Sequence, residues 1–134
     1  MTLNEKIINN DLSDEAADHY IKICENNLST VDDLVNNQRK TDTEMWALGY
    51  EYSGAAELSF AEHELSAAKL YKRLLSKYRD YIASIPEDDV VDEFDRIENR
   101  FEQHKNEMSH DEMDTVDVDA FWAKLVGKPC EKEQ

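Results

Sequence analysis

The sequence contains few of the residues that interrupt helices or cross-link a chain. Its 134 residues include three glycines, two prolines and two cysteines. Because breaks are so few and no sustained alternation of apolar and polar residues occurs, a fold built from strands is excluded and long helices are favoured. Cys24 lies on a predicted helix face and Cys130 lies in a polar tail, so we expect no structural disulfide and a reducing compartment.

Long apolar runs are also missing. No segment approaches the roughly 20 apolar residues that a membrane-spanning helix requires. The first residues lack the basic and apolar segments of a secretory signal. We therefore expect a cytoplasmic protein that makes no membrane contact.

The sequence does contain three apolar stripes with heptad-like spacing. Over residues 17–35, 58–82 and 90–108, apolar side chains recur every three or four positions, which places them on one face of a helix. This pattern predicts an all-α fold, namely an elongated antiparallel helical hairpin or three-helix bundle with coiled-coil-like seams and a short C-terminal helix.

Local signals set the expected ends of these helices. Ser13 is a predicted N-cap, residues 41–44 form a Thr-Asp-Thr-Glu capping box that starts a second helix, and Pro86 stops that helix. Gly49 and Gly54 mark an expected kink or a close helix approach within it. We expect a short helix at 3–9 and longer helices at about 14–39, 42–85 and 88–108, which together form one domain over residues 1–108.

The second and third predicted helices match in the length and phase of their stripes. In an antiparallel hairpin, Tyr78 faces Phe94 and Tyr71 faces Phe101. The same hairpin sets basic residues near the end of one helix beside the acids that begin the next. We expect ion pairs between them, with a nucleic-acid groove as the alternative. The basic residues are Lys69, Lys72, Arg73, Lys77 and Arg79.

The C-terminal segment has a different character. Residues 109–117 are predicted to form a solvated acidic linker, and residues 118–126 a short amphipathic helix that precedes a polar tail to residue 134. The large apolar side chains of this helix must be buried, either on this chain's own bundle or in a groove of a partner. These candidate partner-binding residues are Phe121, Trp122 and Leu125.

No catalytic constellation is visible. A carboxylate-bridged di-metal centre requires Glu residues on four helices and two Glu-x-x-His units, and only Glu107 and His110 have that spacing. No nucleophile has a base at useful spacing, and no glycine-rich loop can cradle a phosphate. We therefore expect a protein that is not an enzyme and that holds no metal or cofactor.

Acidic side chains dominate the composition. The chain has 31 acids and 15 bases, which gives a formal net charge of −16. Over residues 87–107, the acids occur about once per 3.5 Å of helix, close to the roughly 3.4 Å phosphate spacing of one DNA strand. The acids that we expect on the outward face, as partner-binding residues, are Asp88, Asp89, Asp92, Asp95 and Glu102.

Two functional hypotheses from different classes follow. The first is a non-enzymatic acidic module that binds a basic, nucleic-acid-binding protein and does not bind DNA itself. It would be a DNA-mimicking inhibitor of the general kind that phages and mobile elements encode. The second is a helical assembly or recombination accessory that binds a partner or single-stranded nucleic acid. A solvated acidic face without a partner is the simplest alternative to both.

Self-association is the last expectation. A second apolar stripe lies beside the seam of the helix predicted at 42–85, and one neighbouring helix cannot cover both stripes. We therefore expect a homodimer, with a monomeric three-helix bundle bent at Gly54 as the alternative. The second stripe consists of Phe60, Ala67, Leu74, Tyr81 and Ile85.

Overall fold

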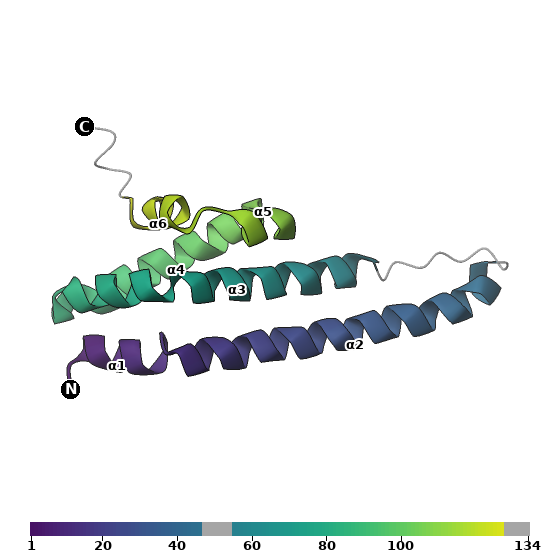
Figure 1. The fold of residues 1–134 in the computed structure, drawn as a ribbon, viewed down its shortest axis with the longest axis horizontal. Coiled ribbons are helices and arrows are strands. Elements are labelled where there is room, and N and C mark those ends of the chain that lie inside the picture. The colour runs from purple at the N-terminus through teal and green to yellow at the C-terminus, as the bar shows by residue number, and fades with distance from the viewer. Residues whose placement is uncertain (47–54, 128–134) are drawn as a thin grey trace.

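The chain folds into helices that run back and forth along one long axis (Figure 1). The computed structural model describes residues 1–46 and 55–127, and the side chains of 1–34 and 57–127. Within these ranges it contains helices and no strand, which confirms the predicted all-α fold, and none of the described helices is long and apolar enough to cross a membrane. The elements are α1 (Leu3–Asn10), α2 (Asp14–Trp46), α3 (Ala55–Ser84), the 3-10 turn η1 (Glu87–Asp89), α4 (Val90–Glu107), α5 (His110–Thr115) and α6 (Val118–Val126).

The central element is α3. Figure 1 shows α1 and α2 in line along one side of α3, with α2 antiparallel to it, while α5 and α6 lie over the other side. The chain turns at η1, and α4 then runs back along α3. Each of the other α-helices contacts α3, so α3 is the helix around which the bundle is built.

The core is centred on the second half of α3. Leu70, Leu74, Tyr78 and Ile82 are fully buried there, at the spacing that puts them on one side of a helix. Side chains from α1, from the turn that follows it, and from α4, α5 and α6 surround them. These are Ile7, Leu12, Val90, Ile97, Phe101, Met113, Phe121 and Leu125.

Aromatic pairs confirm the predicted register between α3 and α4. The rings of Tyr71 and Phe101 meet edge to face with 5.3 Å between their centroids. Those of Tyr78 and Phe94 meet edge to face at 6.4 Å. Both arrangements are favoured by the ring quadrupoles, and they show that these two stripes are the faces along which the helices pack.

Polar groups fix the start of the chain to the bundle. The predicted short helix is α1, which opens with a capping box between Thr2 and Glu5. The buried Asn4 side chain donates hydrogen bonds of 2.7 Å to the carbonyls of Ile82 and Ile85. Because carbonyls at a helix C-terminus have no helical partner, these bonds satisfy the end of α3 and anchor α1 to it.

The predicted break between the first two helices is wrong. The N-cap role of Ser13 is confirmed, since its hydroxyl accepts a hydrogen bond from the backbone N–H of Ala16, but α2 continues to Trp46. Residues 41–44 therefore lie inside α2 and do not start the helix that ends at Ser84. A capping box stabilises a helix start without forcing one, because its residues cost less than about 1 kcal/mol each inside a helix.

The expected kink falls in a segment that is not described. The helix predicted at 42–85 is replaced by the last residues of α2 and by α3, which begins at Ala55. Gly49 and Gly54 both lie outside the described residues.

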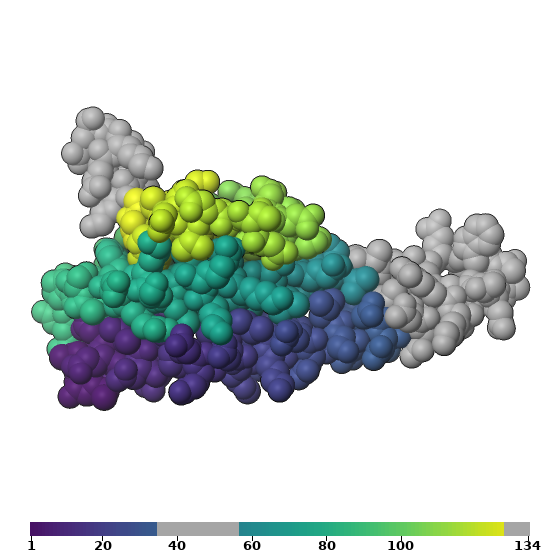
Figure 2. All heavy atoms as spheres, in the orientation of Figure 1, coloured from purple at the N-terminus to yellow at the C-terminus, as the bar shows by residue number. Residues whose placement is uncertain are grey.

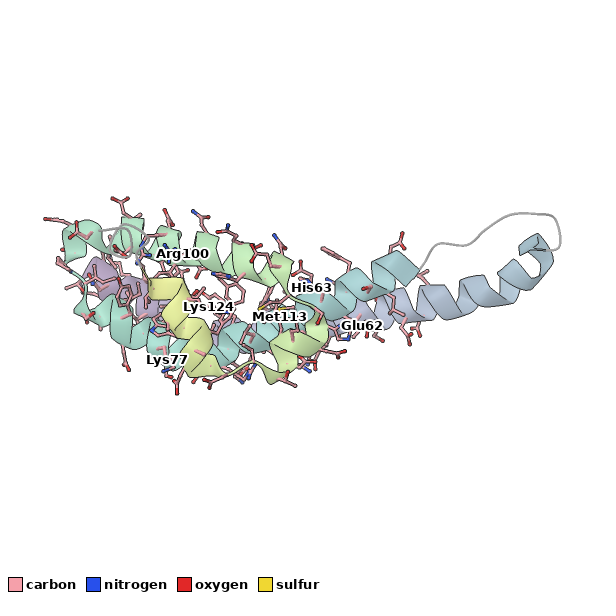
Figure 3. All side chains as sticks on the ribbon, turned by 90° about the horizontal axis from the view of Figure 1, so that it is seen from above. Glu62, His63, Lys77, Arg100, Met113 and Lys124 are labelled. Atoms are coloured by element: carbon pink, nitrogen blue, oxygen red, sulfur yellow. The ribbon has the colours of Figure 1, made fainter. Side chains whose placement is uncertain are left out.

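The predicted linker at 109–117 is also wrong. Most of it forms α5, which begins with a capping box between Ser109 and Glu112. Met113, labelled in Figure 3, is fully buried against the core. A satisfied cap contributes about 0.5–2 kcal/mol and a fully buried Met side chain about 1.5–3 kcal/mol, and both favour a docked helix over a solvated linker.

Candidate functional site

Four of the predicted partner-binding acids form one exposed line along the outside of α4. We call Asp88, Asp92, Asp95 and Glu102 the acidic stripe. Asp88 lies in η1 and the others lie in α4, and all four side chains are exposed. Their spacings of four, three and seven residues keep them on one side of a helix. Figure 3 shows side chains of α4 projecting outward along one edge of the molecule.

The fifth predicted acid departs from this line. Asp89 is exposed, but it lies where η1 ends and α4 begins, and its side chain makes no capping hydrogen bond. One residue of 3-10 helix turns by about 120°, so Asp89 points away from Asp88. The predicted group of five is therefore a line of four with one acid beside it.

Glu102 is tied to a buried lysine. Lys105 Nζ lies 3.2 Å from a carboxylate oxygen of Glu102 and 3.2 Å from one of Glu64 on α3, and Lys105 is only 8% exposed. Burial lowers the pKa of Lys105, but the two carboxylates outweigh burial and hold that pKa above its ordinary value. Part of the charge of Glu102 is therefore already compensated within the chain.

A pocket of about 280 Å³ opens beside the acidic stripe. We call it the three-helix pocket, because α2, α3 and α4 supply its walls and Asp11 stands between α1 and α2. The small side chains of Ala67 and Ala68 leave the space that it occupies. Its larger lining side chains are Tyr20, Glu64, Tyr71, Glu98, Phe101, Glu102 and Lys105. Aromatic faces beside carboxylates suit an organic cation.

Glu98 is a carboxyl of this pocket with a raised pKa. Burial is the main cause of the rise, and the hydrogen bond that the Tyr71 hydroxyl donates to Glu98 opposes it. The carboxylates of Glu102, Asp11 and Asp95 add to the rise. The net result is a pKa of about 7, so the negative charge of the pocket increases as the pH rises through neutrality.

A second hollow, which sequence reasoning did not identify, lies between α2 and α3 beyond the end of α4. We call it the distal groove. Phe60 is 65% exposed at its edge, and the sequence did place Phe60 on a stripe beside the main seam. That stripe was the one feature of the sequence that pointed to the groove. Whether its side chains are buried depends on neighbouring helices, which periodicity within one helix does not reveal. The groove is lined by Cys24, Asn27, Thr30, Val31, Glu57, Phe60, Ala61 and Glu64.

The basic cluster at the end of α3 pairs with elements other than those predicted. We expected it to face the acids that begin α4, but carboxylates of α2 and α6 hold three of its members, and Arg73 donates to backbone carbonyls at α5 and just after it. The physical reason is that α4 packs on the aromatic side of α3, whereas these bases lie on its other sides. The ion pairs are Lys72 with Asp18, Arg79 with Asp14, and Lys77 with Asp119.

The helix α6 docks on this chain's own core, which is the first of the two alternatives for this helix and corrects the assignment of Phe121 and Leu125 as partner-binding residues. Phe121 is 1% exposed and Leu125 is fully buried, while the half-buried Trp122 packs edge to face on Tyr78 at 5.0 Å. Arg100 of α4 donates to carbonyls at the C-terminal end of α6 (Figure 3), which lack helical partners. Phe121 and Leu125 are thus core residues, packed in the same apolar cluster as the buried side chains of α3 and α4.

The Glu-x-x-His spacing near the end of α4 does not produce a metal centre. Glu107 ends α4 and His110 begins α5, so the two do not share one helix face. A carboxylate oxygen of Glu107 lies 3.9 Å from Nδ1 of His104, and Nε2 of His110 lies 3.3 Å from a carboxylate oxygen of Asp111. Across the described part of the chain, no three His, Cys, Asp or Glu side chains gather as metal ligands.

Comparisons with known proteins assign no family. No protein-family model, no curated protein and no solved structure matches this chain.

Proposed function

We propose that this chain is a non-enzymatic, acidic protein-binding module that binds the basic surface of a nucleic-acid-binding protein and competes there with DNA or RNA. The observation that carries the proposal is the acidic stripe, whose carboxylates are exposed along one side of α4 and of the adjoining turn η1. Phage-type and mobile-element-type inhibitors that imitate DNA would use such a surface.

The rigidity of α4 supports this proposal. Val90 and Ile97 are fully buried and Phe101 is 4% exposed, so the side of α4 opposite the acidic stripe is fixed in the core. A carboxylate array that is already ordered loses little conformational entropy when it binds. From Asp88 to Glu102 the array spans about 21 Å at 1.5 Å per residue, which is comparable to six or seven phosphates of one DNA strand.

The internal pairing of the basic cluster favours an inhibitor over a nucleic-acid-binding accessory. Lys72, Lys77 and Arg79 each have a carboxylate partner within this chain. The formal net charge of the whole chain, −16, would repel a phosphate backbone. The proposed partner is therefore a basic protein, and direct DNA binding is not expected.

The test is a charge-matched pair of variants. One replaces Asp88, Asp92 and Asp95 with Asn and Glu102 with Gln. The control neutralises four exposed acids of α2, namely Glu15, Glu25, Asp32 and Asp33. Partners captured from a lysate by the wild type are identified by mass spectrometry, and each variant is then titrated against the purified partner holding fluorescent duplex DNA.

The stripe variant should lose at least tenfold in affinity and in DNA displacement, because steering and docking both use these charges, while the control changes less than threefold. Equal losses of affinity in both variants would show that binding depends on the net charge of the chain and not on the acidic stripe. Measurable DNA binding by the wild type would favour the accessory hypothesis instead.

The homodimer and the cytoplasmic location remain predictions. Sedimentation equilibrium between about 5 and 200 μM tests the first, and a mass near 15.6 kDa at every concentration would exclude a dimer. Fractionation of cells that express the tagged chain tests the second.

A further inference from the structure

The distal groove and the three-helix pocket adjoin along the same side of α3. Glu64 lines both hollows. On α3, positions 57, 60, 61, 64, 67, 68 and 71 face them in turn, which is the repeat of one helix face. At 1.5 Å per residue this face is about 21 Å long. We call the two adjoining hollows together the α2–α3 groove, and the stretch of α3 that lines them is about as long as four turns of a helix.

The floor of the α2–α3 groove is apolar, and aromatic side chains stand open at its edge. Val31 is half-buried, and Ala61 and Cys24 are buried beneath. Tyr20 is 51% exposed and Phe60 is 65% exposed. Figure 2 shows that the start of α3 and the adjoining stretch of α2 extend beyond α5 and α6. Exposed aromatic side chains over an apolar floor are typical of an interface centre.

The rim of the α2–α3 groove is acidic. Five carboxyls line it, from Asp11, Glu57, Glu64, Glu98 and Glu102, against one lysine. That lysine, Lys105, is already held between Glu64 and Glu102. A second copy of this chain would bring another acidic rim and another net charge of −16 to the same place, so charge complementarity selects a basic occupant over a second copy.

We propose that the α2–α3 groove binds an amphipathic helix of a basic partner protein, with the helix's apolar face against Val31, Phe60 and Ala61 and its Lys or Arg side chains toward the acidic rim. Apolar residues at positions i, i+3 or i+4, and i+7 of such a helix meet the floor, as in other helix-in-groove complexes. Tyr20 and Phe60 offer ring faces to the flanking cations. The inference rests on the proposed function in one respect, since both assume a basic protein as partner.

The experiment uses defined peptides as probes. The first is an amidated 18-residue peptide with Leu at helical spacing and Lys elsewhere. The second has the same composition in an order without helical period, and the third carries Glu in place of Lys. Each is fluorescently labelled and titrated with the full chain while anisotropy is measured, and amide chemical shifts locate the bound peptide.

Variants at exposed positions separate the groove from the acidic stripe. Phe60→Ala should weaken the periodic basic peptide about tenfold, whereas Val91→Ala, at an apolar position of α4 that is 47% exposed outside the groove, should change binding less than twofold. A triple variant with Asn at Asp88, Asp92 and Asp95 should also bind the peptide within about twofold of the wild type. It removes stripe acids that do not line the groove.

The inference stands if the periodic basic peptide binds at least tenfold tighter than both other peptides and shifts amides of 16–31 and 57–71. Equal binding of the second peptide, which has the same composition but no helical period, would overturn it, because only charge would then be recognised. Shifts confined to the outer side of α4, or self-association of the wild type that buries Phe60, would overturn it as well.

The two proposals fail separately. If the peptide result holds but the triple variant at Asp88, Asp92 and Asp95 still binds the natural partner with full affinity, the competition proposal fails and the groove stands. If the triple variant loses the partner but the peptide does not bind the wild type, the groove fails and the competition proposal stands.

Discussion

The two halves of α3 carry the same kind of apolar pattern but meet different surroundings. In the second half, Leu70, Leu74 and Tyr78 are fully buried under α1, α4, α5 and α6. In the first described turns, Leu58 is half-buried and Phe60 is 65% exposed, because α2 is the main neighbour there. Periodicity thus marks the side chains that are available for packing, and the number of helices around them decides which ones are used.

The two halves also differ in how polar groups are used. At the core end, Asn4, Arg73 and Arg79 donate to backbone carbonyls of distant segments and fix those segments in place. At the groove end, Glu57 and Glu64 border a hollow that faces solvent. Polar side chains at the core end thus hold distant segments together, whereas the groove end leaves apolar and acidic groups side by side at the surface.

The strongest test of this contrast is a pair of phenylalanine truncations. Phe121→Ala should lower the free energy of unfolding by about 3–5 kcal/mol, because Phe121 is 1% exposed and its removal leaves a cavity between α4 and α6. Urea denaturation followed by circular dichroism measures the change. A loss below about 1 kcal/mol would mean that α6 does not dock as described.

A pH titration tests the buried carboxyl of the three-helix pocket. The pKa of Glu98 is about 7 in the folded chain against an ordinary value of 4.5. Between these values the folded state binds a proton that the unfolded state has released, so stability falls as the pH rises. Glu98→Gln removes this dependence. The wild type should therefore lose on the order of 1–3 kcal/mol relative to the variant between pH 5 and pH 8.

The measurement is urea denaturation of both proteins at each pH. Subtracting the variant's free energy of unfolding from that of the wild type at each pH cancels the contribution of the other acids. A difference that stays constant across the range, or that grows in favour of the wild type at high pH, would contradict the raised pKa.

Removal of the buried lysine should have a smaller effect. Lys105→Met keeps the apolar stem but leaves Glu64 and Glu102 without their shared cation. The loss should be about 1–2 kcal/mol, below that of a fully buried pair because both carboxylates retain some solvent contact. Lys69→Met, at an exposed position, is the control. Equal stability of the two variants would show that the Lys105 pairs contribute no more than exposed ones do.

The smallest effect is expected at the groove. Phe60→Ala should change the free energy of unfolding by less than about 0.5 kcal/mol, since an exposed side chain leaves no cavity. Comparison with Phe121→Ala in the same denaturation series therefore measures the difference between the two ends directly. A loss above about 2 kcal/mol at Phe60 would mean that this side chain is buried in solution, by this chain or by a second copy.

Much of the helical framework could be predicted, and the failures have a common cause. The seam between Tyr71 and Phe101 followed from period and phase, and α6 was placed at its observed residues. The false helix start at 41–44 and the false linker at 109–117 were judged from local signals alone. Capping strength and polarity are local quantities, whereas the burial of Met113 depends on α3 and on the rest of the core.

The candidate site was predictable in part for the same reason. Outward acids follow from the seam, because a known buried face fixes the opposite one, and Asp92 and Asp95 are exposed as expected. The three-helix pocket and the α2–α3 groove could not be foreseen, since they are spaces between helices. The bond between Tyr71 and Glu98 joins residues 27 positions apart, and no periodicity within one helix encodes it.

The sequence by itself therefore determined that this protein is helical, strongly acidic and built on apolar seams, because those properties depend on residue type and spacing along one element. Tertiary structure decided which carboxyls are buried, which bases are neutralised, where α6 docks and which stretch of α2 and α3 stays open. These outcomes depend on distances between elements, and such distances arise only when the helices compete for the same apolar surface.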